Sequence, residues 1–168
     1  NNVSYQWAQT DPKGLADYAT TLKSKTTQRQ LLDNAARQWA ETDPKAAMAW
    51  AATLPDSDLR TSAYASLSSG WAQHAPQEAA NFVASLPAGE AQDRAAQSVV
   101  SSWSNADPKA AAVWAGDFPE GQNRESALRT VVQNWANNDP FAAAEWLQNL
   151  PVGKSRDSAV GSLVDSIS

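Results

Sequence analysis

The residue types that carry most enzyme and metal chemistry are scarce in this chain. His74 is its only histidine and it has no cysteine, which excludes a multi-histidine metal site, a histidine-centred triad, a cysteine nucleophile and a disulfide. The nearest approach to a calcium loop, Asp56-Ser57-Asp58, lacks the glycine and glutamate that close such a loop. We therefore expect a protein that is not an enzyme and that holds no cofactor and no metal.

Four aspartates recur at multiples of a 32-residue spacing, each directly before a proline. This is the pattern of helix N-caps, whose carboxylate accepts hydrogen bonds from the first free N–H groups of a helix. Catalysis by paired carboxylates would need acids from other rows of the sequence. Gly89, Gly121 and Gly153 stand singly, as turn residues do, and not in a phosphate-binding loop. The four aspartates are Asp11, Asp43, Asp107 and Asp139.

The eight tryptophans are the strongest hint of a binding site. Exposed aromatic rows would suit sugar rings or proline-rich peptides. Because the rows share helical spacing with alanine and leucine, we predict instead that they fill the core between closely approaching helices. A carbohydrate-binding module with exposed aromatic rows is the alternative. The first row is Trp7, Trp39, Trp71, Trp103 and Trp135, and the second is Tyr18, Trp50, Phe82, Trp114 and Trp146.

Two rows of basic residues also recur. Arginines that follow a turn lie near the last carbonyls of the preceding helix, so we predict that they donate to those carbonyls. Lysines that follow the Asp-Pro pairs gain nothing from their own helix dipole and form either solvated surface or an edge for an acidic partner. The arginines are Arg60, Arg124 and Arg156, and the lysines are Lys13, Lys45 and Lys109.

All of these rows follow a 32-residue repeat, and repeats of such length indicate stacked supersecondary units. Each unit reads as two helices, the first beginning at Asp-Pro and ending before a second proline. Ala47, Trp50, Ala51 and Leu54 lie on one stripe of such a first helix. The two proline series are Pro12, Pro44, Pro76, Pro108 and Pro140, and Pro55, Pro87, Pro119 and Pro151.

A hairpin of this length cannot bury its apolar face alone, so neighbouring hairpins must stack and share a core. We predict an all-α fold, specifically an α-solenoid of about five antiparallel helical hairpins in a superhelix. Residues 1–168 would form a single continuous array and part of a longer protein. Its predicted parts are a leading helix fragment 1–11 and the units 12–43, 44–75, 76–107, 108–139 and 140–168.

The pattern resembles the tetratricopeptide class of helical-hairpin repeats and, more loosely, HEAT-like arrays, from Trp7 to Ile167. The motifs Trp-Ala-x-x-Asp-Pro and Leu-Pro-x-Gly-x-x-Arg are also similar to repeats in uncharacterised bacterial proteins. The 32-residue period is slightly shorter than that of tetratricopeptide repeats. Tryptophan also ends the second helix here and does not open the first. The resemblance implies peptide binding in a concave groove.

Composition limits the partners. The chain has 168 residues and a formal net charge of −5, which argues against nucleic acids and anionic membranes as partners. No apolar run approaches the roughly 18 residues of a membrane span, so we expect no direct insertion. The lack of cysteine and the abundance of small polar residues suit the cytoplasm as well, but slightly favour a periplasmic or extracellular location. Net charge differs between units, which suggests end-to-end self-association as a further possibility.

The leading hypothesis is a non-catalytic scaffold or adaptor that binds a protein or peptide through a concave face or an edge. Binding residues should lie where units differ, because shared positions are required for stacking. A buried second row would contradict this hypothesis. The first candidate row is Lys13, Lys45, Gln77, Lys109 and Phe141, and the second is Asp17, Ala49, Asn81, Val113 and Glu145.

Overall fold

The computed structural model describes residues 2–168, apart from the side chain of Asn2. Over this range the chain is all-α, with eleven helices and no strand, as predicted. The helices are α1 (Asn2–Thr10), α2 (Pro12–Thr20), α3 (Lys25–Thr42), α4 (Pro44–Ala52), α5 (Ser57–His74), α6 (Pro76–Ser85), α7 (Glu90–Ala106), α8 (Pro108–Gly116), α9 (Gln122–Asn138), α10 (Pro140–Gln148) and α11 (Lys154–Ile167). Among the described residues, no helix has the length and apolar character needed to cross a membrane.

The short helices begin where the Asp-Pro pairs predict. Proline occupies the first turn, where its missing N–H costs nothing, and the preceding aspartate accepts from a free backbone N–H. This cap is present at Asp11, Asp43, Asp107 and Asp139, with distances of 2.9, 3.1, 3.0 and 3.0 Å. α6 is the exception, because Ala75 stands in the cap position and offers no side-chain acceptor. The predicted N-caps are therefore confirmed.

The long helices begin in two different ways. Ser24 and Asp56 cap α3 and α5 through their side chains. Gly121 precedes α9 without a side-chain cap, and its φ of 155° lies in a region that glycine reaches much more readily than other residues. Gly89 has the same φ before α7. The predicted turn role of these two glycines therefore has a backbone cause.

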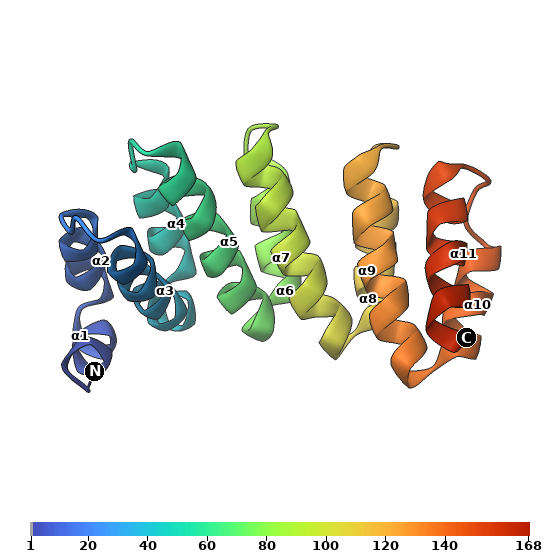
Figure 1. Ribbon diagram of the computed structural model, residues 1–168, viewed down its shortest axis with the longest axis horizontal. Coiled ribbons are helices and arrows are strands. Elements are labelled where there is room, and N and C mark those ends of the chain that lie inside the picture. Colours follow the sequence, from blue (N-terminus) through green and yellow to red (C-terminus); the bar gives the residue numbers. More distant parts are fainter. Residues whose placement is uncertain (1) are drawn as a thin grey trace. The chain divides into compact units, whose positions relative to one another are not determined.

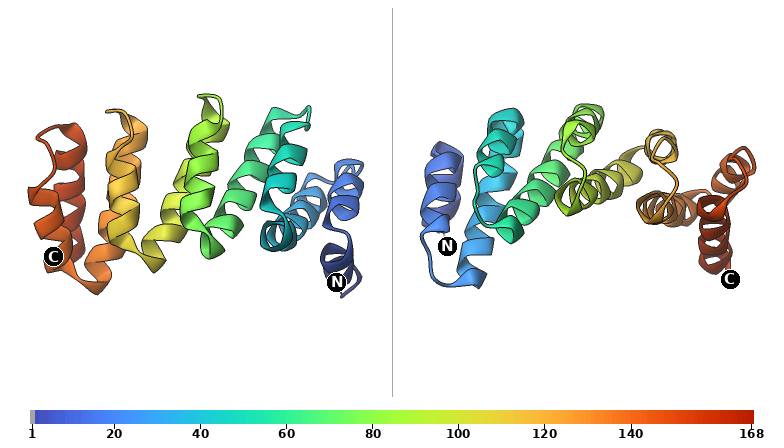
Figure 2. Two further views of the ribbon diagram at one scale, coloured as in Figure 1. Left: turned by 180° about the vertical axis from the view of Figure 1, so that it is seen from behind. Right: turned by 90° about the horizontal axis from the view of Figure 1, so that it is seen from above.

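The first of two compact units ends at Ser98. Its short helices α2, α4 and α6 form one layer and its long helices α3 and α5 form the other (Figure 1, Figure 2). α3 packs against α2, α4 and α5, and α5 packs against α4 and α6. Leu15, Met48 and Leu67 are each 1% exposed and fill the space between the layers.

The second compact unit spans Val99–Ser168. Here α9 packs against α8, α10 and α11, and α10 also packs against α11. Leu128, Val131 and Val132 of α9 are completely buried in this cluster. Small residues such as Ala111 and Ala143 face them, which lets the short helices approach closely.

The two aromatic rows meet ring to ring. Ring centroids are 5.4 Å apart in Trp7–Tyr18, 5.8 Å in Trp39–Trp50, 5.6 Å in Trp71–Phe82, and 6.2 Å in both Trp103–Trp114 and Trp135–Trp146. Trp39, Trp71 and Trp135 are at most 8% exposed, which confirms the core prediction for them. The second row is half-buried, except that Tyr18 is 48% exposed.

Candidate functional site

An open cleft of about 500 Å³ lies on the long-helix layer of the first unit. Asp33, Arg37 and Glu41 of α3 line one side, at intervals of four residues and therefore on one face of the helix. Ser98 of α7 belongs to the other side. α5 supplies the remaining lining residues, which are Ala65, Ser66, Ser69, Gly70, Gln73 and His74.

Small residues of α5 let this helix approach α3 closely beside the cleft. A Cβ at Gly70 would lie 3.0 Å from the Cβ of Ala40 on α3. The hydroxyl of Ser66 donates a 2.8 Å hydrogen bond to Oδ1 of Asp33, which joins the two helices. The cleft therefore has a firmly held boundary of short side chains.

Charge alternates along the α3 side of the cleft. Asp33 is engaged by Ser66, and Glu41 lies 4.0 Å from Nε2 of His74 at the far end. Arg37 stands between the two acids and makes no ion pair within the described part of the chain. The guanidinium of Arg37 is thus the charged group of the cleft that is available to pair with an acidic group of a partner.

A second hollow of about 240 Å³ lies nearer the start of the same helices. Arg29 of α3 lines it, four residues before Asp33, so the charged stripe continues along this helix. Across the hollow, Arg94 pairs with Glu90 of α7 at 3.0 Å. Its remaining lining residues are Asp58, Thr61 and Ser62 of α5.

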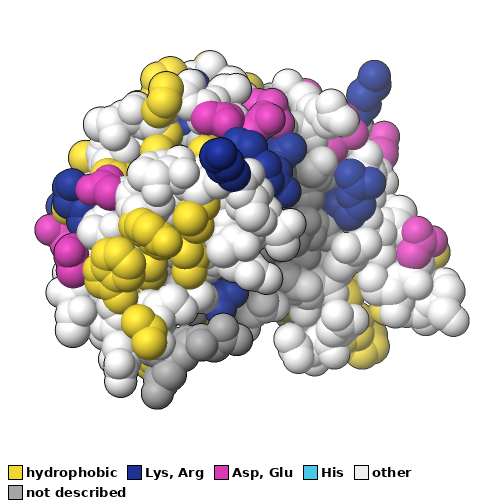
Figure 3. Space-filling view, turned by 60° about the vertical axis from the view of Figure 1, so that its left-hand side comes forward, with side chains coloured by type: hydrophobic (Ala, Val, Ile, Leu, Met, Phe, Trp, Pro, Cys, Tyr) yellow, Lys and Arg dark blue, Asp and Glu magenta, His cyan; other side chains and the backbone are white. Residues whose placement is uncertain are grey.

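Both candidate rows predicted from the sequence are exposed. They lie on the short helices, away from the residues that line the cleft. Phe141 is 86% exposed and Val113 54%. The space-filling view shows hydrophobic, basic and acidic side chains next to one another on the visible surface (Figure 3). The exposed members are Lys13, Lys45, Gln77, Lys109, Phe141, Asp17, Ala49, Asn81, Val113 and Glu145.

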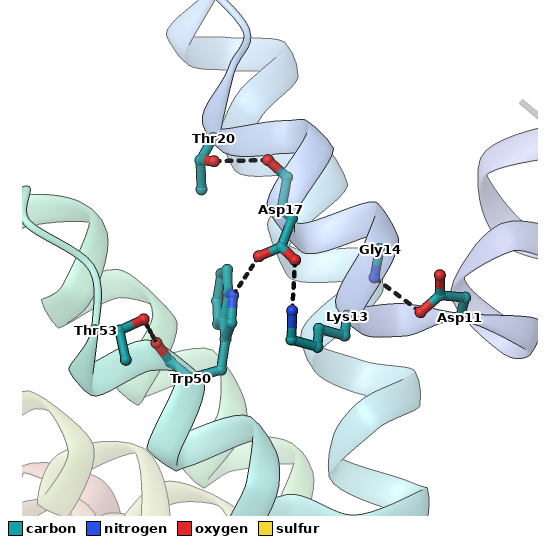
Figure 4. A network of polar contacts seen from close by, with 7 residues as sticks. All are labelled: Asp11, Lys13, Gly14, Asp17, Thr20, Trp50 and Thr53. Carbon is teal, nitrogen blue, oxygen red and sulfur yellow. Dashed lines mark hydrogen bonds and ion pairs between the residues drawn. The ribbon is translucent and has the colours of Figure 1, made fainter.

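Two of these candidates bind each other. Nζ of Lys13 lies 2.7 Å from Oδ2 of Asp17, and Nε1 of Trp50 donates to Oδ1 of Asp17 at 2.7 Å (Figure 4). The hydrogen bond from Lys13 lowers the pKa of Asp17, with a smaller contribution from Trp50, against the opposing effect of desolvation. Asp17 thus joins α2 to α4, a role that the sequence analysis did not assign to it.

The carbonyl-donor role predicted for the arginine row holds at Arg60. Its Nη1 donates to the carbonyl oxygen of Leu54 at 2.9 Å. Arg124 departs from the prediction, because its Nη1 pairs with Oε2 of Glu120 at 2.9 Å. A carboxylate one turn earlier in the chain offers a stronger acceptor than a helix carbonyl.

Sequence reasoning missed two glutamines, Gln28 and Gln92, which lie 32 residues before and after Arg60. Nε2 of Gln28 donates to the carbonyl of Thr20 at 3.3 Å, and Nε2 of Gln92 donates to those of Val83 and Leu86 at 3.0 Å each. Their spacing from Arg60 could have predicted this role, because a long side chain with N–H donors recurs at this position every 32 residues.

His74 and the cleft itself were also missed as a candidate site. The sequence placed His74 in a turn, whereas it is the last residue of α5 and lines the cleft. The sequence pattern that could have predicted the cleft is a series of residues four apart on each long helix. The series is Arg29, Asp33, Arg37 and Glu41 on α3, and Ser62, Ser66, Gly70 and His74 on α5.

Within the described residues, no group of three or more potential metal ligands comes together. Comparisons with protein-family models, curated proteins and solved structures gave no match to this chain.

Proposed function

We propose that this protein is a non-catalytic scaffold, an α-solenoid of 32-residue hairpins, that binds a peptide segment of a partner protein in the α3–α5–α7 cleft. The observation that carries the proposal is the open 500 Å³ cleft with charged groups along one side and small polar groups beside them. The solenoid is supported by the aromatic ring pairs and Asp-Pro caps, which recur at multiples of the 32-residue period in both units.

The α3 side favours a partner segment of alternating charge. Residues four apart on a helix are separated by about 6 Å along its axis, so Asp33, Arg37 and Glu41 present a negative, a positive and a negative group in sequence. A segment that carries basic, acidic and basic side chains at matching intervals would pair with all three. Such complementarity selects the partner and its register more than it adds affinity.

A carbohydrate-binding role has less support. Sugar recognition relies on exposed aromatic faces, and none of the described residues that line the cleft is a tryptophan, tyrosine or phenylalanine. Within the two aromatic rows, Tyr18 has a large exposed surface, and its ring lies against that of Trp7. If this role were correct, oligosaccharides would shift tryptophan fluorescence while cleft variants left that response unchanged.

Selection from a random-peptide display library followed by calorimetry tests the proposal. Arg37→Glu should weaken selected peptides by at least about ten-fold, because it replaces the unpaired cation with a third acid. Ala65→Trp should do the same by filling the cleft. Arg129→Glu is the matched control, since Arg129 is an exposed arginine on α9 outside the cleft.

The proposal is wrong if selection yields no binding peptide. It is also wrong if Arg37→Glu and Ala65→Trp bind the selected peptides as well as the Arg129→Glu control does. Circular dichroism of each variant verifies that the helices are intact before binding is compared.

A further inference from the structure

The 240 Å³ hollow lies beside the 500 Å³ cleft, along the same three helices. On each helix, one turn separates a residue that lines the hollow from a residue that lines the cleft. These pairs are Arg29 and Asp33 on α3, Ser62 and Ser66 on α5, and Arg94 and Ser98 on α7. The two spaces therefore follow one another along a single trough that lies over α5.

The trough has a low floor of short side chains and long charged side chains beside it. The floor residues belong to α5 and are buried or half-buried: Thr61, Ser62, Ala65, Ser66, Ser69 and Gly70. Arg29 and Arg37 of α3 are exposed. α5 lines the trough from Asp58 to His74, which corresponds to about 24 Å along a helix axis. This length suits a chain segment of several residues better than a single small ion.

Arg29 stands in the hollow as Arg37 stands in the cleft. Neither arginine forms an ion pair with any residue that the structure describes. Asp33, which lies between them on α3, accepts a hydrogen bond from Ser66. The two arginines are eight residues apart, which is about 12 Å along the axis of α3. One side of the trough thus presents two guanidiniums at a fixed separation, each available to an acidic group.

The other charged residues of the hollow do not oppose an incoming acid strongly. Glu90 is already paired with Arg94, and the two side chains are 71% and 60% exposed, so water screens the pair and breaking it costs little. Arg94 can therefore turn towards the same acid from the side opposite Arg29. Asp58 lies in the first turn of α5, where the helix dipole stabilises its carboxylate.

We propose that the hollow binds an acidic side chain of the same partner segment that occupies the cleft, so that this segment carries two acidic residues about 12 Å apart. One acid pairs with Arg37 and the other with Arg29. The inference rests on the proposed peptide binding in the cleft and specifies what the peptide carries. An extended chain covers this distance in about four residues and a helix in about eight, so the spacing of the two acids also reports the conformation of the segment.

Peptides selected from the display library against the wild-type chain test this pattern. Their sequences should share two acidic positions at a constant separation of about four or about eight residues. In calorimetry, Arg29→Glu should weaken these peptides by at least about five-fold, because it replaces an attraction by a repulsion. A synthetic peptide with lysine in place of one of the two acids should then bind Arg29→Glu more tightly than the parent peptide does. Arg129→Glu, on α9 and outside the trough, is the matched control and should bind the parent peptide as the wild type does.

Two results would overturn this inference and leave peptide binding in the cleft intact: selected peptides that share one acidic position alone, or equally tight binding of them by Arg29→Glu and the wild type. If neither lysine peptide restores binding to Arg29→Glu, the direct pairing is also wrong. A selection that yields no binding peptide would instead refute the proposed function, and this inference with it.

Discussion

At the scale of single residues, Asp17 shows how a side chain chosen for its exposure can have a structural task. Its two carboxylate oxygens accept from Lys13 in the same helix and from the indole of Trp50 in α4. The equivalent position in α8 is Val113, which has no acceptor to offer the corresponding indole of Trp146. A valine at this position therefore cannot make the bond that Asp17 makes with Trp50.

Replacing Asp17 by asparagine should lower the free energy of unfolding by about 0.5–1 kcal/mol at pH 7, because the carboxylate is half exposed and its bonds are screened by water. Its pKa is lowered in the folded chain, so this contribution is present above the usual value of 3.8 and is lost as pH falls through the folded value. Urea unfolding of both chains at several pH values should show the difference shrinking towards pH 3. Glu145→Gln, at the same slot of α10, is the control, and an equal loss there would contradict the prediction.

At the scale of elements, the starts of the short helices share one geometry. Ala75 before α6 has φ −142° and ψ 70°, close to the −151° and 78° of Asp43 before α4. The backbone of α6 is thus ready for a cap that its sequence lacks.

Ala75→Asp should raise the free energy of unfolding by about 0.5–1 kcal/mol, because the new carboxylate can accept from the N–H of Glu78. Asp43→Ala should lower it by about 1 kcal/mol by removing the bond to Ala46. Thermal unfolding monitored by circular dichroism measures both. Opposite signs are the essential result, and a destabilising Ala75→Asp would refute the shared geometry.

Gly121→Ala should destabilise the second unit by about 1 kcal/mol or more, since a φ of 155° is strained for alanine. Gly116→Ala is the matched control, because nothing lies within 4 Å of a Cβ there and α8 already includes this residue. Chemical unfolding should show little change or a small gain for the control. Equal losses in the two variants would mean that backbone strain is not the cause.

At the scale of the whole molecule, the chain consists of two compact units, each with buried hydrophobic residues of its own. The helix contacts within each unit join elements that are close in the sequence, so stability is expected to vary along the chain. A defect in the core of one unit should therefore be felt most strongly within that unit.

Leu128→Ala should cost about 2–5 kcal/mol, because this side chain is completely buried among α8, α9 and α10. Hydrogen exchange followed by mass spectrometry should show faster exchange in α8–α11 than in the wild type, with a smaller change in α2–α5. Met48→Ala, in the core of the first unit, should give the reverse distribution. A uniform acceleration over both units would instead show that they unfold as one.

Much of the local structure could be predicted because its causes lie within a few residues along the chain. Asp43 and Pro44 start a helix through one carboxylate and one missing N–H, and Gly121 permits a backbone angle that alanine resists. The candidate site could be predicted only in part. Residue differences between the 32-residue segments led to the two exposed rows. The cleft could not be predicted, because the sequence does not show which faces of α3, α5 and α7 meet solvent.

By itself, the sequence determined the helical class, the starts of the short helices and the core position of Trp39, Trp71 and Trp135. Only the tertiary structure decided that Arg37, His74 and Ser98 line one cleft and that Trp50 binds Asp17. The physical reason is the range of the interactions. Caps and turns act between chain neighbours, whereas clefts and exposed faces arise from contacts between residues far apart in the sequence, such as Asp17 with Trp50 and Asp33 with Ser66.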